Sequence, residues 1–260
     1  MLSRRRLLHS ALAGTGCTAC AALAAGVPSR PARAADVPSL VEGPGYALRF
    51  VGSQREAIML GLRDARLDLR TLQGHSHLYG LGPIEGLRGE VTIVDGRPSL
   101  ARVASDGGVR VEESFDAGVP FFVWAEVSDG WRGVPVPDGV RSYAELEAFV
   151  GEAGRAAGLT RAFPFTVTGV PARVDLHVVN LAPGAPPGMA VHGEGQANIA
   201  LSGRQATLVG FWSAEHAAVF TPMDSRVHIH VQSAGNDMSG HVDRVDLAGG
   251  GMVLGLPASA

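Results

Sequence analysis

Lysine is absent from this sequence of 260 residues, so all 22 of its basic residues are arginines. A Schiff base to a substrate or to pyridoxal phosphate needs a lysine amine, and that whole branch of chemistry is therefore excluded. Any reaction that passes through a carbanion would need another group to take up the electron pair. A Lewis-acidic metal ion is the obvious candidate.

Cysteine is nearly absent as well, and both cysteines, Cys17 and Cys20, lie in residues 1–34. This segment has the pattern of an export signal: a basic start at residues 3–8 that resembles a twin-arginine motif, an alanine-rich apolar run, and Ala32-Arg-Ala34 as a cleavage site. The apolar run is broken by glycine and threonine, which suits a bilayer span poorly. We expect cleavage after Ala34, a periplasmic or secreted product, and neither a lipid anchor nor stable membrane insertion.

Removal of residues 1–34 would leave a chain without cysteine and therefore without disulfides or thiolate ligands. Histidine, aspartate and glutamate remain for any metal. The same cleavage removes five arginines and no acids, which leaves 17 arginines against 25 acids and moves the formal charge from −3 to −8. That charge argues against nucleic acid as a partner.

Hydrophobic periodicity predicts an α+β fold of mainly antiparallel or mixed β-sheets in two sheet-containing halves with few helices. We expect residues 35–260 to form the folded part, with a division near residues 150–160, where glycine and alanine accumulate. Helices are expected at Gln54–Leu62 and Tyr143–Ala157, the second capped by Ser142 with Glu145 three residues later. The expected strands are Tyr46–Val51, Leu78–Leu81, Glu90–Val94, Phe121–Val127, Phe163–Thr168, Arg173–Val179, Ala197–Leu201, Thr207–Trp212, Arg226–Gln232 and His241–Leu247.

The most informative pattern is His228-Ile-His230, followed eleven residues later by His241. On a strand, alternation sends His228 and His230 to one face, about 6.6 Å apart along the chain, while their neighbours face a core. A turn would bring an antiparallel strand that begins near His241 alongside. Three neutral histidines that leave one coordination position open are typical of a catalytic zinc site.

Several motifs occur in an order that resembles the α-acetolactate decarboxylase family. They are Gly80-Leu-Gly82, Leu87-Arg-Gly-Glu90 with Asp95-Gly96 close behind, Thr207-Leu-Val-Gly-Phe211, His228-Ile-His230 and Gly240-His-Val242. The similarity runs over most of the chain after residue 34, from near Gln54 to the strand after His241. Histidine spacing is its most specific part, and the strand at Glu90 is the next.

The resemblance implies an enzyme that converts 2-acetolactate, or a similar small 2-hydroxy-3-oxo acid, to acetoin and carbon dioxide in a dimeric assembly. His228, His230 and His241 would bind Zn²⁺, which would stabilise an enediolate so that no organic cofactor is needed. Glu90 would lie beside the metal and move the proton that completes acetoin.

Two features depart from the family pattern. Where the family places an arginine that holds the substrate carboxylate, this sequence has His177, which could serve if protonated or could act as a further metal ligand. Arg173 on the same strand face is the nearest candidate to replace the arginine. Family members also supply a glutamate after the third histidine, whereas this sequence has no acid after Asp246. Asp243, two positions from His241, is the candidate substitute.

His75 and His77 form an additional pair, which could supply imidazoles for a second metal, for proton transfer or for a different substrate. His192 and His216 are isolated and are interpreted as structural. Two other functions stay open: an exported metal-binding or ligand-binding protein of the same fold without turnover, and a lyase that acts on a different substrate.

Overall fold

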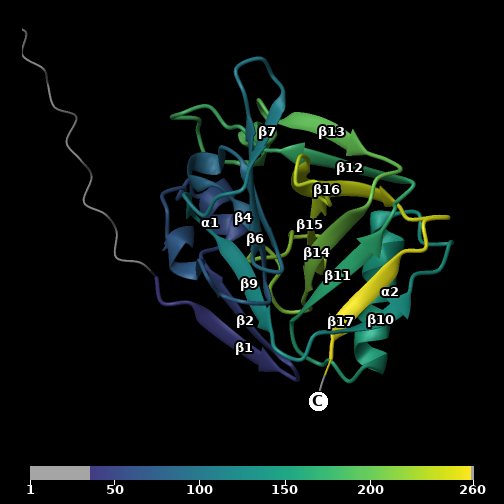
Figure 1. Cartoon of the computed structure of the whole chain (residues 1–260). Helices are drawn as coiled ribbons and strands as arrows, with labels where there is room; N and C mark the ends of the chain where they lie inside the picture. The colour runs from purple at the N-terminus through teal and green to yellow at the C-terminus, as the bar shows by residue number, and fades with distance from the viewer. Residues whose placement is uncertain (1–35, 259–260) are drawn as a thin grey trace, which may run out of the picture. The chain divides into compact units, whose positions relative to one another are not determined.

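Two large antiparallel sheets make up most of the computed structural model, which describes residues 36–258 (Figure 1). The proposed export segment, residues 1–34, lies outside the described residues. The expected α+β class, with antiparallel sheets dominating and few helices, is confirmed. Within the described part, no helix is both long enough and apolar enough to cross a bilayer.

The first sheet has seven strands in the order β1-β2-β9-β4-β5-β6-β7. Its strands are β1 (Ser39–Gly43), β2 (Tyr46–Val51), β4 (Leu78–Pro83), β5 (Glu90–Val94), β6 (Arg97–Val103), β7 (Val109–Glu112) and β9 (Phe122–Val127). A small two-stranded sheet, β3 (Leu67–Asp68) with β8 (Gly118–Val119), accompanies it.

The second sheet has eight strands in the order β10-β17-β11-β14-β15-β16-β12-β13. Its strands are β10 (Trp131–Pro135), β11 (Phe163–Gly169), β12 (Arg173–Val178), β13 (Ala197–Leu201), β14 (Ala206–Trp212), β15 (Val227–Ser233), β16 (Ser239–Asp246) and β17 (Val253–Pro257). The chain passes from the first sheet to the second between β9 and β10. The division near residues 150–160 stays a prediction.

Short helices complete the structure: α1 (Gln54–Met59), α2 (Tyr143–Ala156), α3 (Met189–His192) and the 3-10 helices η1 (Leu69–Leu72) and η2 (Glu85–Leu87). The hydroxyl of Ser142 accepts from the backbone N–H of Glu145 at 3.2 Å, so the predicted cap of α2 is present. Ser53 caps α1 in the same way through the N–H of Glu56. These caps satisfy amide groups that the helix itself leaves free.

The two large sheets face each other, and α2 packs on the other side of the second sheet. Alternation along β15 follows the prediction. Its even-numbered side chains reach the first sheet, where His230 contacts Thr92 and Gln232 contacts Ser99. Its odd-numbered side chains, Val227, Ile229 and Val231, belong to the main apolar core together with Leu146 and Val150 of α2. A second apolar cluster lies on the outer side of the first sheet.

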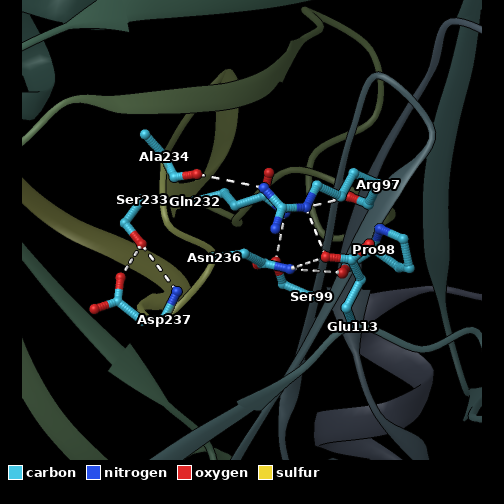
Figure 2. Close-up of polar contacts among 9 residues, drawn as sticks. All are labelled: Arg97, Pro98, Ser99, Glu113, Gln232, Ser233, Ala234, Asn236 and Asp237. Atoms are coloured by element: carbon cyan, nitrogen blue, oxygen red, sulfur yellow. Dashed lines mark hydrogen bonds and ion pairs between the residues drawn. The ribbon is translucent and has the colours of Figure 1, made fainter.

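A polar network holds the turn between β15 and β16 against strand β6 of the other sheet (Figure 2). Asn236 in the turn donates to the Pro98 carbonyl at 3.2 Å and also pairs with Ser99, while Gln232 donates to Ser99. The backbone of Asn236 has φ = +54°, a conformation that asparagine tolerates better than most residues. This network fixes the hairpin that carries all three predicted histidine ligands.

Candidate metal centre

His228, His230 and His241 converge at one point. His230 and His241 are direct partners across the antiparallel β15–β16 pair, as the sequence pattern predicts. One ring nitrogen from each of the three histidines lies within 4.8 Å of the others. The Nε2 atom of His228 is 3.0 Å from Nδ1 of His241. Ligand nitrogens on a tetrahedral zinc ion lie about 3.3 Å apart for bonds of about 2.05 Å, so this spacing suits a metal.

Hydrogen bonds behind the rings select which nitrogen faces the common point. Nδ1 of His228 lies 2.7 Å from the Phe220 carbonyl, which can only accept, so Nδ1 carries the proton and Nε2 keeps its lone pair. Nδ1 of His230 lies 3.1 Å from the Thr92 hydroxyl, which itself accepts from Ser239. Such outer contacts orient metal-binding histidines and fix their tautomers.

The protonation state of the three histidines also suits a bound cation. Nε2 of His230 is fully buried and has no hydrogen-bond partner among residues 36–258, although a buried ring nitrogen ordinarily has one. Burial lowers the pKa of His228 to about 4, and it lowers the pKa values of His230 and His241 well below the ordinary range. The three rings are therefore neutral at pH 7, which is the form that binds metal.

Glu90 opens β5 in the first sheet and reaches across to this cluster. Its Oε2 lies 3.7 Å from Nε2 of His230, and the residue is only 4% exposed. Burial raises the pKa of Glu90 to about 7, against a smaller opposing effect of His177. A carboxyl group in that range is present in both protonation states at neutral pH and can both release and take up a proton.

His177 and Asp243 form a pair beside the cluster, with Nδ1 of His177 2.8 Å from Oδ1 of Asp243. Strand β16 has a β-bulge at this point, because Asp175 pairs with Arg244 whereas Leu176 pairs with Val242. Asp243 is the extra residue, and bulges commonly redirect a side chain next to a site. Burial lowers the pKa of His177, but its hydrogen bond to Asp243 and the charge of Glu90 outweigh this and raise the pKa overall.

Gly240 allows β16 to come this close to β12. A side chain at this position would place its Cβ 2.5 Å from the His177 carbonyl oxygen. Together, His177, His241 and Asp243 form a second group that could hold a metal, and this group shares His241 with the first.

A cavity of about 490 Å³ opens onto the cluster. Its polar lining includes Glu90, His177, His228 and His241, whereas His230 is buried behind them. Cavities of this size ordinarily bind small molecules. A ligand in this cavity would meet two of the three histidines and the Glu90 carboxyl group.

Several residues singled out in the sequence lie away from the cavity. Arg173 is bound to Asp175, with 2.7 Å between Nη2 and Oδ1, and does not line the cavity wall. His77 precedes β4 at the end of the strand opposite to the end that pairs with Glu90, and it contacts Asp95 at 3.1 Å. His75 faces Glu126, with 3.5 Å between the closest side-chain atoms. The structure thus keeps both extra histidines apart from the metal cluster.

The sequence patterns did not identify several other cavity residues as part of the site. Gln54 and Arg55 of α1 line the cavity, and Arg55 forms no ion pair with any residue in the described range. Both are placed by backbone bonds to the 218–219 segment. His192, interpreted from sequence as structural, also lines the cavity. The cap at Ser53 was a usable signal for the start of α1, but no local pattern indicates which helix face meets the site.

The comparison with protein families identifies one family. The family model described as "Alpha-acetolactate decarboxylase" matches residues 50–255. The structure resembles that of α-acetolactate decarboxylase from Bacillus subtilis strain 168, with a TM-score of 0.61 and 18% identity over 81% of this chain and 85% of that chain. It also resembles acetolactate decarboxylase from B. subtilis subspecies spizizenii, with a TM-score of 0.62 and 18% identity over 81% and 86% of the two chains.

A third similar structure is a Staphylococcus aureus protein of unknown function that is described as similar to α-acetolactate decarboxylase. Its TM-score is 0.61, with 17% identity over 80% of this chain and 84% of that one. No curated protein matches the sequence. At these identities the structural likeness establishes the fold.

Proposed function

Because this chain belongs to the α-acetolactate decarboxylase family, we propose that it is a zinc-dependent carboxy-lyase that converts 2-acetolactate, or a similar small 2-hydroxy-3-oxo acid, to a hydroxyketone and carbon dioxide. The observation that carries the proposal is the buried cluster of three neutral histidines beside a carboxyl group whose pKa is raised to about 7. Nothing in this chemistry calls for an organic cofactor.

His228, His230 and His241 would hold the metal through the nitrogens that face their common point. Bound there, a divalent cation would supply Lewis-acid stabilisation of the negative charge that develops as carbon dioxide leaves. The Phe220 carbonyl keeps His228 in the tautomer that binds metal, and the contact with Thr92 holds the ring of His230 in place. The chain therefore contributes a preformed set of neutral ligands.

Glu90 is the proton donor in this proposal. Cleavage of the bond between carbon 2 and the carboxylate carbon leaves an electron pair on the substrate, and one proton must reach the substrate carbon to give the hydroxyketone. Protonated Glu90 can supply it, because burial keeps part of this carboxyl group neutral near pH 7. Solvent in the cavity would then return a proton to the carboxylate.

Two groups in the wall can attract the negative charge of the substrate. Arg55 lines the cavity without an ion-pair partner among the described residues, and its guanidinium can hold a carboxylate through two hydrogen bonds. His177, whose pKa is raised chiefly through Asp243, adds a partial positive charge close to the metal cluster. We assign carboxylate binding to Arg55 in place of Arg173, which Asp175 already engages.

Export and assembly belong to the same proposal. Cleavage after Ala34 would release residues 35–260 into the periplasm or the medium, and the family resemblance implies a homodimer. N-terminal sequencing of the protein from cell fractions and the mass of the purified assembly in solution test these two points. A cytoplasmic protein that begins at residue 1, or a monomer at all concentrations, would contradict them.

The central test is turnover by metal-defined protein. Protein stripped with a chelator and reloaded with zinc should convert racemic 2-acetolactate to acetoin with release of an equal amount of carbon dioxide. His230→Gln should lose both zinc and activity, whereas His75→Gln, which changes a histidine outside the cluster, should keep them. A protein that binds one zinc ion per chain but decarboxylates neither 2-acetolactate nor a larger 2-hydroxy-3-oxo acid would defeat the proposed function.

A further inference from the structure

The lining of the cavity combines two chemically different sets of residues. One set is the polar groups already described, among them Glu90, His177 and His228. The other set is apolar and comes from four different segments of the chain. These residues are Ile58 of α1, Leu87 of η2, Phe121 before β9 and Val179 after β12.

The apolar lining residues belong to a separate cluster, distinct from the two large cores of the fold. Its members are Ala57, Ile58, Leu87, Phe121, Val179 and Leu181, with Ala185 packed against them. None of its four lining side chains is more than 8% exposed. These side chains form the wall of the cavity, so the free surface of the cluster is the surface that a ligand would meet.

Methionines surround the open side of the same cavity. Met59, Met189 and Met223 all line it, although they come from α1, α3 and the segment before β15. They are 41%, 60% and 68% exposed, and what matters is that all three lie around one cavity, since a group of exposed apolar side chains often marks a binding site. Methionine is flexible and adapts to apolar surfaces of different shapes. Three of them at one opening extend the apolar surface outward.

The space is large for the smallest substrate of the proposed reaction. 2-Acetolactate has nine non-hydrogen atoms and only two methyl groups, whereas cavities of roughly 300–1,000 Å³ ordinarily bind ligands of drug size. Held by the polar groups, 2-acetolactate has too few apolar atoms to cover the apolar lining of the 490 Å³ cavity, and part of that lining would stay in contact with water. That arrangement would leave unused the attraction of apolar surface for apolar ligand atoms.

We infer that the preferred substrate is a 2-hydroxy-3-oxo acid that carries, on carbon 2, an apolar substituent of about four or more carbons, with or without an aromatic ring, in place of the methyl group of 2-acetolactate. This inference rests on the proposed function, because the metal-binding histidines would hold the hydroxyacid group and leave the substituent to meet the apolar lining, which includes Ile58, Leu87 and Phe121. The bond changes are those of acetolactate decarboxylation. The product is a larger hydroxyketone, with carbon dioxide as the other product.

Turnover of two substrates provides the first measurement. The zinc-loaded protein is given 2-acetolactate and 2-hydroxy-2-isobutyl-3-oxobutanoate, and the kcat/KM of each is determined. Each buried methylene contributes about four-fold, so the three additional carbons should raise kcat/KM by tens of fold. A kcat/KM for 2-acetolactate that equals or exceeds that of the larger substrate overturns the inference and leaves the proposed function standing.

Binding provides a second measurement that does not depend on turnover. Lactate, 2-hydroxyhexanoate and 3-phenyllactate share the hydroxyacid group and cannot undergo this decarboxylation, so their affinities can be measured by calorimetry. Affinity should rise along the series by at least ten-fold. A rising series without any decarboxylase activity would remove the proposed function while the substituent preference stands, and a flat series would remove the preference.

A variant at the opening of the cavity tests whether the apolar lining causes the preference, as distinct from the general effect of adding a surface charge. Met223→Glu places a charge at the opening and should lower the ratio of the 3-phenyllactate affinity to the lactate affinity by several-fold. Leu40→Glu is the matched control, because Leu40 is an exposed apolar residue on β1, 50% exposed, that does not line the cavity. An unchanged ratio in Met223→Glu, or an equal fall in Leu40→Glu, would count against the apolar wall as the determinant.

Discussion

At the scale of single residues, Glu90 has a pKa raised to about 7 by burial. Replacing it with glutamine keeps the shape but removes the proton. Since a positioned acid or base contributes about 10²–10⁴-fold, Glu90→Gln should lower kcat by that factor while zinc content stays unchanged. Steady-state kinetics and metal analysis on the same preparation check this.

Glu194 is the control for that substitution because it is an exposed glutamate that does not line the cavity. Glu194→Gln should leave kcat unchanged. Full turnover in Glu90→Gln would show that the proton comes from another group.

Arg55 and Arg173 allow a paired comparison at the same scale. Arg55 lines the cavity, whereas Arg173 is bound to Asp175. We predict that Arg55→Ala lowers kcat/KM for 2-acetolactate by roughly ten-fold to a hundred-fold, in line with the loss of a charge-assisted hydrogen bond of about 1.5–3 kcal/mol. Arg173→Ala should change it little. The reverse order in kinetic assays would restore the assignment that the sequence suggested.

At the scale of elements, the hairpin β15–β16 depends on the polar network of Figure 2. Asn236 has a positive φ, and its side chain forms hydrogen bonds to Pro98 and Ser99. Alanine tolerates a positive φ less well than asparagine and cannot form these hydrogen bonds. Asn236→Ala should lower the free energy of unfolding by about 1–3 kcal/mol, since it leaves buried partners unpaired. Urea unfolding checks this, with exposed Asn198→Ala expected to fall within about 0.5 kcal/mol of the parent.

The sequence predicted β15 well because its alternation of histidine with β-branched residues is unambiguous. Strand β6 was not predicted, since Pro98 and flanking arginines weaken the pattern. Strands β10 and β17 were not predicted either, because each has only five residues and contains glycine and proline. They pair with each other although about 120 residues separate them in the sequence. Local patterns carry little information about such distant pairings.

At the scale of the whole molecule, Tyr46 links the two sheets. Its hydroxyl on β2 donates to the Ala162 carbonyl, just before β11, at 2.8 Å. Tyr46→Phe should therefore lower the free energy of unfolding by about 1 kcal/mol at neutral pH, because the buried carbonyl loses its donor. Urea titration at pH 7 measures the difference.

Alkaline pH tests the same contact. Burial raises the pKa of Tyr46 from 10.0 to about 12. The folded state therefore favours the neutral phenol, and the resulting stability is complete below pH 10 and is lost as the pH rises through 12. The unfolding free energy of Tyr46→Phe should fall less steeply between pH 10 and pH 12 than that of the parent. Parallel curves would show that Tyr46 does not titrate as its burial implies.

How much of the site could be predicted from sequence depended on how far apart its residues lie along the chain. His228, His230 and His241 lie on one hairpin, so spacing along the chain sufficed to group them. Arg55 and His192 could not be grouped with them from sequence, because α1 and α3 reach the cavity only through the packing of the whole chain. The direction of the Asp243 side chain, two residues after the ligand His241, could not be predicted from sequence either. The bulge at Asp243 breaks the strand alternation on which such a prediction depends.

All three imidazoles come from the second sheet, whereas the acid that faces them comes from the first. The proposed cation binding and proton delivery thus depend on opposite sheets of the fold. A small separation of the sheets would leave the ion in place while moving the acid out of reach. Under mild denaturation, product formation should therefore cease before the ion is released, so that an inactive but still metallated species precedes global unfolding.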